Sequence, residues 1–301
     1  MSEGAASAYA AINKAVLKAP PPAPVWSIWG AGFGGTNKTN GDLTVIGSRD
    51  LTSSAYGFAI GADYRAIPDS VVGFAMSGGG TNWGLAQGLG GGRSDALQVG
   101  VYGSKSWGEF YTAGSASFAN YWLTTDRNLI FAPDHLTASF DAQSYGGRLE
   151  GGYHFATMPG VVTPYVAVQE QSFHLPSCSE VDMTGDGFGL SFNSRTATDT
   201  RAEVGARFES STMLIPAMTF RGRLAWAHDW VSDPTVAAVF RALPGAAFIV
   251  NGATPAKDSL LTSAGAEYHI SQSVAVIGKF DGEFANNSKT YAGTGTVRVS
   301  W

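Results

Sequence analysis

The stretch YAGTGTVRVSW, residues 291–301, alternates between apolar and polar side chains up to its last position. Trp301, Val299 and Val297 are apolar, and each residue between them is polar. Successive side chains of a β-strand point to opposite faces of a sheet, so the stretch predicts a strand with one apolar face. The ends of soluble domains usually fray into polar tails. A strand that carries a Trp to the last residue of the sequence departs from that rule and raises the question of its purpose.

The composition of the whole chain is poor in charge and rich in glycine. Hydrophobic residues make up 44% of the 301 residues and charged residues 14%, whereas soluble domains carry about 25% charged residues. The mean hydropathy is only +0.00, and no apolar run reaches the roughly 18 residues that a membrane helix needs. These values exclude a helical membrane protein and disfavour an ordinary soluble enzyme.

No motif for catalysis, cofactors or nucleic acid is present. The net charge is −5, without the basic stripe that nucleic-acid binding needs. The lone Cys178 provides no disulfide framework, and the five His residues lack zinc-ligand spacing. The stretch DMTGDG at 182–187 resembles the start of a calcium loop without its closing Glu, so we interpret it as a surface turn. We predict no catalytic residue, metal or cofactor.

The first part of the chain, residues 1–24, differs from the rest. Residues 2–18 are rich in Ala, the best helix former, and predict a slim helix; the stretch KAPPPAP then ends it with an extended spacer. Such small side chains suit a narrow polar channel, although a loose extension has the same composition. The first residues lack the basic start and apolar core of a secretory signal, so an exported protein is expected to carry its signal upstream.

From residue 25 to 301, alternating segments recur between turn-forming residues. They are about 9–16 residues long, whereas soluble strands average about 5–6 and tilted membrane strands need about 9–11. We therefore predict an all-β fold, a 12-stranded antiparallel transmembrane β-barrel with the N-terminal α-helix inside the pore. The predicted strands are residues 25–35, 53–65, 70–84, 94–105, 108–123, 140–155, 161–174, 198–209, 218–230, 259–270, 273–284 and 291–301.

The predicted connections alternate between short and long. Bacterial membrane barrels place short turns on the periplasmic side and long loops on the extracellular side. With twelve strands, both chain ends lie on the short-turn side. The short turns are 65–70, 105–109, 156–161 and 270–273, and the long connections are 36–52, 85–93, 124–138, 175–197 and 231–258.

Within several strands, charge occupies one face and apolar side chains the other. In TDTRAEVGARFE, Arg201, Glu203 and Arg207 share a face opposite Val204 and Phe208. An Arg or Lys turned to lipid at mid-depth costs about 2–4 kcal/mol, so we expect the charged face to line the pore. The charged residues predicted to face the pore are Arg148, Glu150, Arg201, Glu203, Arg207, Arg221, Arg223, Glu267, Lys279, Asp281, Glu283 and Arg298.

The strands of a soluble β-sandwich show the same alternation of polar and apolar side chains. The strand lengths, the low charge and the aromatic residues near strand ends favour a membrane barrel, because Trp and Tyr concentrate at membrane interfaces. These aromatic residues are Trp26, Trp122, Tyr153, Trp230, Tyr291 and Trp301.

The order of these segments resembles the translocator domain of autotransporters, the type V secretion system. The resemblance covers nearly the whole chain. It rests on an Ala-rich helix before VWSIWGAGFGG, then AYGFAIGADY (55–64), VVGFAMSGGGTNW (71–83), VVTPYVAVQEQSF (161–173), GRLAWAHDW with AVFRALPGAAFIVNGA (222–253), and the terminal GTGTVRVSW.

This resemblance implies an integral outer-membrane protein that secretes an upstream passenger domain through its pore. The final strand resembles the signal read by the barrel assembly machinery, with Tyr291, Val297, Val299 and Trp301 as the matching positions. Expected partners are the passenger, that machinery, periplasmic chaperones and outer-membrane lipid including lipopolysaccharide, with no nucleic acid. A monomer is expected.

The same resemblance places the helix in the pore as a plug. Its polar contacts are expected from Asn13, Lys14 and Lys18. Family members that cut their passenger inside the pore use an Asn-Asn junction; here Asn13 precedes Lys14, so such cleavage is not expected. Two other functions fit a barrel: a porin-type diffusion channel, and an outer-membrane hydrolase with a catalytic site at its rim.

Overall fold

The computed structural model describes residues 25–41, 48–67, 69–129, 134–185, 187–211, 217–232, 235–251 and 256–301. The predicted helix at 2–18, with Asn13, Lys14 and Lys18, lies outside the described residues, as does the spacer that follows it. Within the described ranges, no helix has the length and apolarity needed to cross a membrane.

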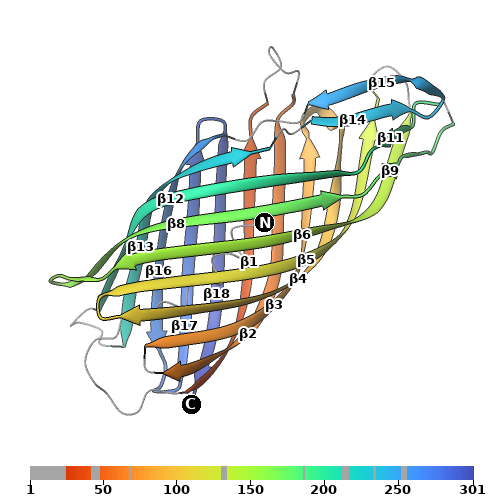
Figure 1. Cartoon of the computed structure of the whole chain (residues 1–301). Coiled ribbons are helices and arrows are strands. Elements are labelled where there is room, and N and C mark those ends of the chain that lie inside the picture. Colours follow the sequence, from red (N-terminus) through yellow and green to blue (C-terminus); the bar gives the residue numbers. More distant parts are fainter. Residues whose placement is uncertain are drawn as a thin grey trace.

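Twelve long antiparallel strands form a tilted barrel (Figure 1). Each contains the alternating pattern from which it was predicted, so the all-β, 12-stranded prediction is confirmed. The strands are β1 (Trp26–Thr39), β2 (Leu51–Ile67), β3 (Ser70–Leu85), β4 (Gly90–Trp107), β5 (Phe110–Asn128), β6 (His135–Tyr153), β8 (Gly160–Leu175), β12 (Arg195–Ser211), β13 (Met218–Val231), β16 (Asp258–His269), β17 (Val274–Ala285) and β18 (Ser288–Ser300).

The sheet closes on itself. Its order runs from β6 back through β1, then to β18 and on to β8, and β6 also pairs with β8. The strand containing the stretch at 291–301 pairs with β1 from Ser27–Ser300 to Thr39–Ser288. Trp26 and Trp301 exchange backbone hydrogen bonds of 3.1 and 3.0 Å at the end of this seam. Closure leaves no open strand edge in the barrel wall.

The barrel has two ends, which we name by what they carry. The C-terminal end holds Trp26 and Trp301, and the loop end holds the connections on the opposite side. Most strands are longer than predicted: β4 begins at Gly90 and β5 continues to Asn128, both inside predicted loops. Glycine and polar residues mark loops in isolated sequence, but here the neighbouring ladder supplies their hydrogen-bond partners.

Two of the long connections contain strands that the sequence analysis did not predict. Short segments within 175–197 and 231–258 form a second sheet of four strands at the loop end: β9 (Cys178–Ser179), β11 (Leu190–Phe192), β14 (Thr235–Phe240) and β15 (Leu243–Asn251). Three further short elements are β10 (Val181–Asp182), which pairs with β6, β7 (Phe155–Ala156), and the 3₁₀ turn η1 (Ala86–Gly88).

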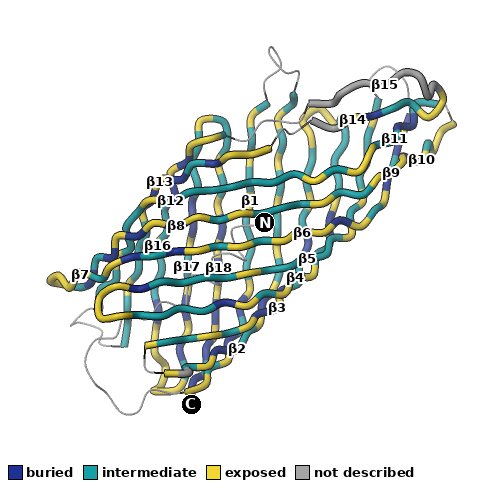
Figure 2. The backbone as a smooth tube through the Cα atoms, in the orientation of Figure 1, coloured by how far each residue is buried: buried dark blue, intermediate teal, exposed yellow. Residues whose placement is uncertain are grey.

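Burial in this fold is inverted relative to a soluble domain. On β2, Phe58 is 63% exposed, Ile60 is 50% exposed, and Ala59 between them is 3% exposed. Exposed and buried residues alternate in this way along the strands (Figure 2). The outer face therefore carries the large apolar side chains, while the inner face carries small, aromatic and charged ones.

On β5, two outer-face aromatic residues lie far apart along the strand. On β5, Phe110 and Trp122 are both exposed and lie twelve residues apart. At a rise of about 3.3 Å per residue and a tilt of about 40°, they are separated by roughly 30 Å along the barrel axis. This height matches an apolar band of about 25 Å bounded by aromatic girdles.

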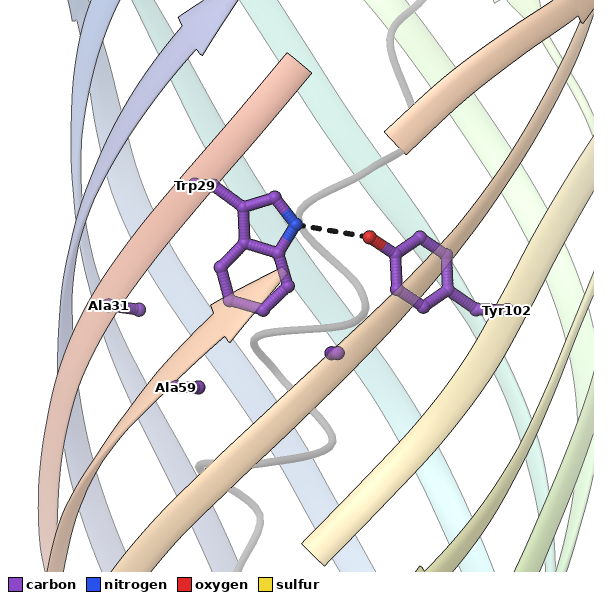
Figure 3. Close-up of a cluster of buried hydrophobic side chains, with 5 residues drawn as sticks. Trp29, Ala31, Ala59 and Tyr102 are labelled. Atoms are coloured by element: carbon purple, nitrogen blue, oxygen red, sulfur yellow. Dashed lines mark hydrogen bonds between the residues drawn. The ribbon is translucent and has the colours of Figure 1, made fainter. Parts of the chain in front are cut away.

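The interior on the β1–β4 side packs aromatic rings against glycine. Trp29 donates its indole N–H to the Tyr102 hydroxyl at 3.0 Å, beside Ala31 and Ala59 (Figure 3). The Trp29 ring lies opposite Gly61 on β2, and a Cβ at Gly61 would lie 2.5 Å from it. Glycine at this position leaves the space that the ring occupies.

Substituting Gly61 with alanine is expected to lower the free energy of unfolding by about 1–3 kcal/mol, because the added methyl group overlaps the Trp29 ring. The matched control is Gly30→Ala on the outer face, where a Cβ meets nothing within 4 Å. Denaturant titration of the lipid-inserted protein measures both. Equal effects of the two methyl groups would refute the packing role of Gly61.

Candidate functional site

The interior of the barrel gathers charged side chains from strands that are not neighbours. Arg201 on β12 contacts Glu283 on β17 at 2.7 Å, although β13 and β16 lie between these strands. Arg207 on β12 bonds Tyr111 on β5 at 2.8 Å. Side chains on the convex outer surface diverge and cannot make such contacts. These charges therefore lie on the concave inner face.

One cluster joins β6 and β12. Glu203 accepts two hydrogen bonds from Arg148, at 2.7 and 2.8 Å, and Glu150 accepts two from Arg207, at 2.5 and 2.7 Å. Arg148 also reaches Glu150 at 3.1 Å. Bidentate Arg–carboxylate pairs of this kind are among the strongest ion pairs in proteins. Here they link β6 to β12 across the intervening strand β8. Both carboxylates are buried.

Aromatic hydroxyls complete this cluster. Tyr111 donates to Glu150 at 2.7 Å, and Tyr165 donates to Glu203 at 3.1 Å. The Arg207 guanidinium lies 4.1 Å from the centre of the Tyr165 ring, in a cation–π contact. Each buried carboxylate therefore has several donors, as a buried charge requires.

Two further groups continue the network along the barrel. Toward the loop end, Arg201 holds Asp229 at 2.6 Å as well as Glu283. Toward the C-terminal end, Arg221 contacts Glu267 at 2.5 Å and Glu209 at 3.2 Å. The network thus extends over much of the barrel height.

The remaining predicted pore-facing charges also lie on the inner face. Lys279 contacts Asp281 at 2.8 Å, and Arg223 lies 3.9 Å from Glu203. Arg298 is buried on β18, where its charge interacts with Glu267. The structure thus brings most of the predicted charges together in pairs.

The opposite wall is nearly uncharged, and the sequence analysis did not single out its one acidic group. Asp63 on β2 accepts hydrogen bonds from Tyr102 and, at 2.8 Å, from Ser27. The remaining inner residues of β1–β4 are mostly Ala, Gly, Ser and aromatic. The sequence did contain a signal for this residue, because Asp63 is the only charged residue of AYGFAIGADY (55–64). The lumen therefore has one charged side and one neutral side.

The interior holds open space of unequal size. A cavity of about 480 Å³ lies toward the loop end, lined mainly by small and neutral residues of β1–β4 and by Tyr121 and Phe173. A smaller cavity of about 100 Å³ lies toward the C-terminal end, against Arg207, Arg221 and Arg223. The roomier half is thus bordered by the neutral wall.

The predicted assembly-signal residues lie together on the outer side of the β1–β18 seam. Tyr291, Val297 and Trp301 are exposed, and Val299 is half-buried. They form one apolar stripe along β18, from its loop end to the final Trp. Their position on one face follows directly from the parity of the sequence.

Large clusters of metal-ligating side chains do not occur among the described residues. These residues hold no cluster of three or more His, Cys, Asp or Glu side chains suited to a metal. His228 and Asp229 lie on opposite faces of β13, with His228 against Trp230 outside and Asp229 on Arg201 inside. His228 and Asp229 therefore do not pair with each other, and His228 instead bonds Asp258 at 2.8 Å.

A closed barrel with an apolar exterior and a charged, partly open interior defines the class of membrane channels and translocators. Residues 28–281 match the family model described as the autotransporter beta-domain, so the chain belongs to the autotransporter β-domain family.

The curated relatives of the chain are much longer proteins. Two curated proteins of Serratia marcescens, both described as an extracellular serine protease, are 21% identical over 263 residues. That alignment covers 86% of this chain and 24% of each relative, so the chain spans about a quarter of the length of the curated relatives it matches.

Solved structures of the same fold include autotransporter domains. The translocator domain of NalP from Neisseria meningitidis has a TM-score of 0.77 at 13% identity, covering 99% of this chain and 94% of that one. The β-domain of Bordetella BrkA has a TM-score of 0.69 at 14% identity, covering 92% and 100%. The chain serves as the translocator and anchor domain of an autotransporter.

Proposed function

We propose that this barrel is integral to the bacterial outer membrane and passes an upstream passenger polypeptide through its lumen to the loop end. It then remains as the passenger's membrane anchor. The single observation that carries the proposal is the inverted barrel: apolar side chains outside, and ion pairs with open space inside. A polypeptide in transit needs a water-filled path, and the lipid needs an apolar wall.

The ion-pair network supports the rigidity that such a path requires. Pairs such as Arg148–Glu203 and Arg201–Glu283 connect strands that share no backbone hydrogen bonds. They brace the wall from within, in addition to the backbone ladders. Because cations and anions are paired, the wall presents little unpaired charge to bind a passing chain.

The N-terminal segment at 2–18 is proposed to occupy the lumen after transit. Lys14 and Lys18 are suited to carboxylates of the charged wall such as Glu150, and Asn13 to either sign of charge. The plug would keep small solutes from leaking through the open half of the lumen.

Deleting residues 2–18 is expected to raise the single-channel conductance in planar bilayers several-fold, because the lumen loses its plug. The control is the Lys14→Ala/Lys18→Ala variant, which keeps the segment and is expected to show brief openings only. An unchanged conductance after the deletion would refute the plug.

The outer stripe of β18 is proposed to be the surface that the barrel assembly machinery recognises, after delivery by periplasmic chaperones. Before closure, β18 presents an unpaired edge with Tyr291, Val297, Val299 and Trp301 on one face. Such an edge is a template for strand pairing. The finished protein is proposed to be a monomer that contacts lipopolysaccharide.

We assign no reaction to this chain. The protease description belongs to relatives about four times longer than this chain. A test of hydrolysis by the refolded chain is expected to give the rate of the buffer alone.

Secretion tests the proposed function directly. A signal peptide and a reporter domain are placed upstream of residue 1, and external protease is added to intact cells. The reporter is expected to be cleaved from outside, and removing Trp301 is expected to abolish both barrel folding and cleavage. Folded barrel in the outer membrane with the reporter left in the periplasm would contradict the translocator role and favour a diffusion channel.

A further inference from the structure

Two acidic residues far apart in sequence meet at the loop end. Asp134 precedes β6, and Asp182 lies in β10, which pairs with β6. The Thr184 hydroxyl donates to Asp134 Oδ1 and also lies 3.3 Å from Asp182 Oδ1. The two carboxylates therefore share a single hydroxyl proton. The Met183 amide, bonded to the His135 carbonyl at 3.0 Å, fixes this arrangement.

Asp134 is buried without enough partners. Its side chain belongs to a residue only 3% exposed, and its Oδ2 has no hydrogen-bond partner among the described residues. A buried, unpaired carboxylate oxygen is costly, and a second carboxylate beside it raises the cost. The nearby Arg127 guanidinium is already engaged by Glu180, at 2.9 and 2.6 Å. The site therefore needs a positive charge that the described side chains do not supply.

The backbone after Asp182 wraps around its carboxylate and holds it in one position. Its carboxylate accepts the amides of Thr184 at 3.1 Å, Gly185 at 2.5 Å and Gly187 at 2.6 Å. Gly185 and Gly187 have φ values of +88° and +86°, which favour glycine.

The sequence DMTGDG has the opening residues of a calcium loop but lacks the closing acid, whose place in the twelve-residue loop falls on Asn193. Asp134 supplies a carboxylate at the same site from a different part of the chain. We propose that Asp134, Asp182 and Thr184 bind a Ca²⁺ ion at the loop end.

The chemistry of the ligands favours Ca²⁺ over other cations. All three side chains offer oxygen, with neither imidazole nor thiolate among them, which disfavours zinc and copper. Mg²⁺ needs a stricter octahedral geometry, whereas Ca²⁺ accepts six to eight irregular oxygens, here completed by water and carbonyl groups. With two carboxylates, the expected Kd is about 0.1–1 mM, the range of extracellular calcium modules.

A bound ion would clamp the hairpin after β10 to the start of β6. β9 and β11 lie on either side of this hairpin, and β11 pairs with β14. The clamp would therefore brace the second sheet at the loop end. This consequence is independent of whether the barrel transports a passenger.

Calorimetric titration of the whole chain tests the proposal. The chain is refolded in detergent without lipopolysaccharide, which itself binds Ca²⁺, and is stripped with EDTA before CaCl₂ is added. Wild type is expected to bind one Ca²⁺, and Asp134→Asn to weaken binding at least tenfold. Asp126→Asn is the matched control, because Asp126 lies half-exposed at the same end near His135, and it is expected to bind as wild type does.

A second variant covers the case in which Asp134→Asn fails to fold, as judged by its heat-modifiable mobility on gels. Thr184→Val keeps both carboxylates and is expected to weaken Ca²⁺ binding several-fold. Absence of Ca²⁺ binding by wild type would overturn the proposal. It would indicate that a proton on one of the two carboxylates, rather than a cation, compensates the buried charge. Equal binding by wild type and both variants, or equal affinity for MgCl₂, would also overturn it.

Discussion

Replacing Phe58 with arginine is expected to lower the free energy of unfolding of the lipid-inserted barrel by about 2–4 kcal/mol. Phe58 lies near the middle of β2 on the outer face and is 63% exposed. If that face contacts the hydrocarbon core, an arginine there must be buried in lipid or must distort the bilayer. In a soluble protein the same exposed substitution would be almost neutral.

The control for this prediction is the same substitution near the membrane surface. Leu85 ends β3 at the loop end, and Leu85→Arg is expected to cost about 0–1 kcal/mol, because the side chain reaches water. Guanidinium titration in phospholipid vesicles, followed by Trp fluorescence, measures both variants. A cost that does not depend on depth would argue against lipid on the outer face.

Replacing Glu203 with leucine is expected to lower the free energy of unfolding by about 3 kcal/mol. Glu203 is 4% exposed and accepts bonds from Arg148 and Tyr165, with Arg223 nearby. Removing one partner of a buried pair costs about 3–5 kcal/mol, because it leaves a buried charge uncompensated. We expect the lower end of this range, because water in the lumen can reach the arginines.

Two variants sharpen this second prediction. Glu109→Leu changes an exposed acid in the turn between β4 and β5, and is expected to change stability by less than about 0.5 kcal/mol. The double variant Glu203→Leu/Arg148→Met removes both charges and is expected to recover about half of the loss. A Glu203→Leu variant as stable as wild type would show that the network does not brace the wall.

The barrel strands could be predicted because the alternation of polar and apolar residues that forms them is contained in each short segment of sequence. In TDTRAEVGARFE, odd-numbered and even-numbered residues fall on opposite faces, and the folded strand keeps this alternation. Strand ends were less predictable. The glycines at 90–92 predict a loop when considered alone, yet they pair with Thr125, Asp126 and Arg127 on β5. The partner strand, which the local sequence does not contain, decides such cases.

The second sheet could not be predicted for a similar reason. β11 has three residues and β9 has two, too few for any period to emerge. Their pairing depends on β14, about fifty residues further along the chain. Strands this short are stabilised by their partners, so their own residues carry almost no signal.

For the interior, the alternation of residues along each strand predicted which charges share a face. It did not predict which of them form ion pairs. The Arg201–Glu283 contact spans 82 residues and depends on the curvature of the closed wall. Tyr111 and Tyr165 were not singled out, because an inner Tyr looks like an outer one until the strand is placed. Asp134 and Asp182 likewise meet only through the pairing of β10 with β6.

The most direct test of the barrel's two faces compares adjacent residues of one strand. Met76 on β3 faces outward, and Ser77 borders the cavity of about 480 Å³. Each is replaced by cysteine in a Cys178→Ser background, spin-labelled, and placed in lipid vesicles for power-saturation EPR. The label at 76 is expected to be reached by oxygen and the label at 77 by a polar nickel reagent. Nickel access at both positions, or oxygen access favoured at both, would contradict a lipid-facing wall around an aqueous lumen.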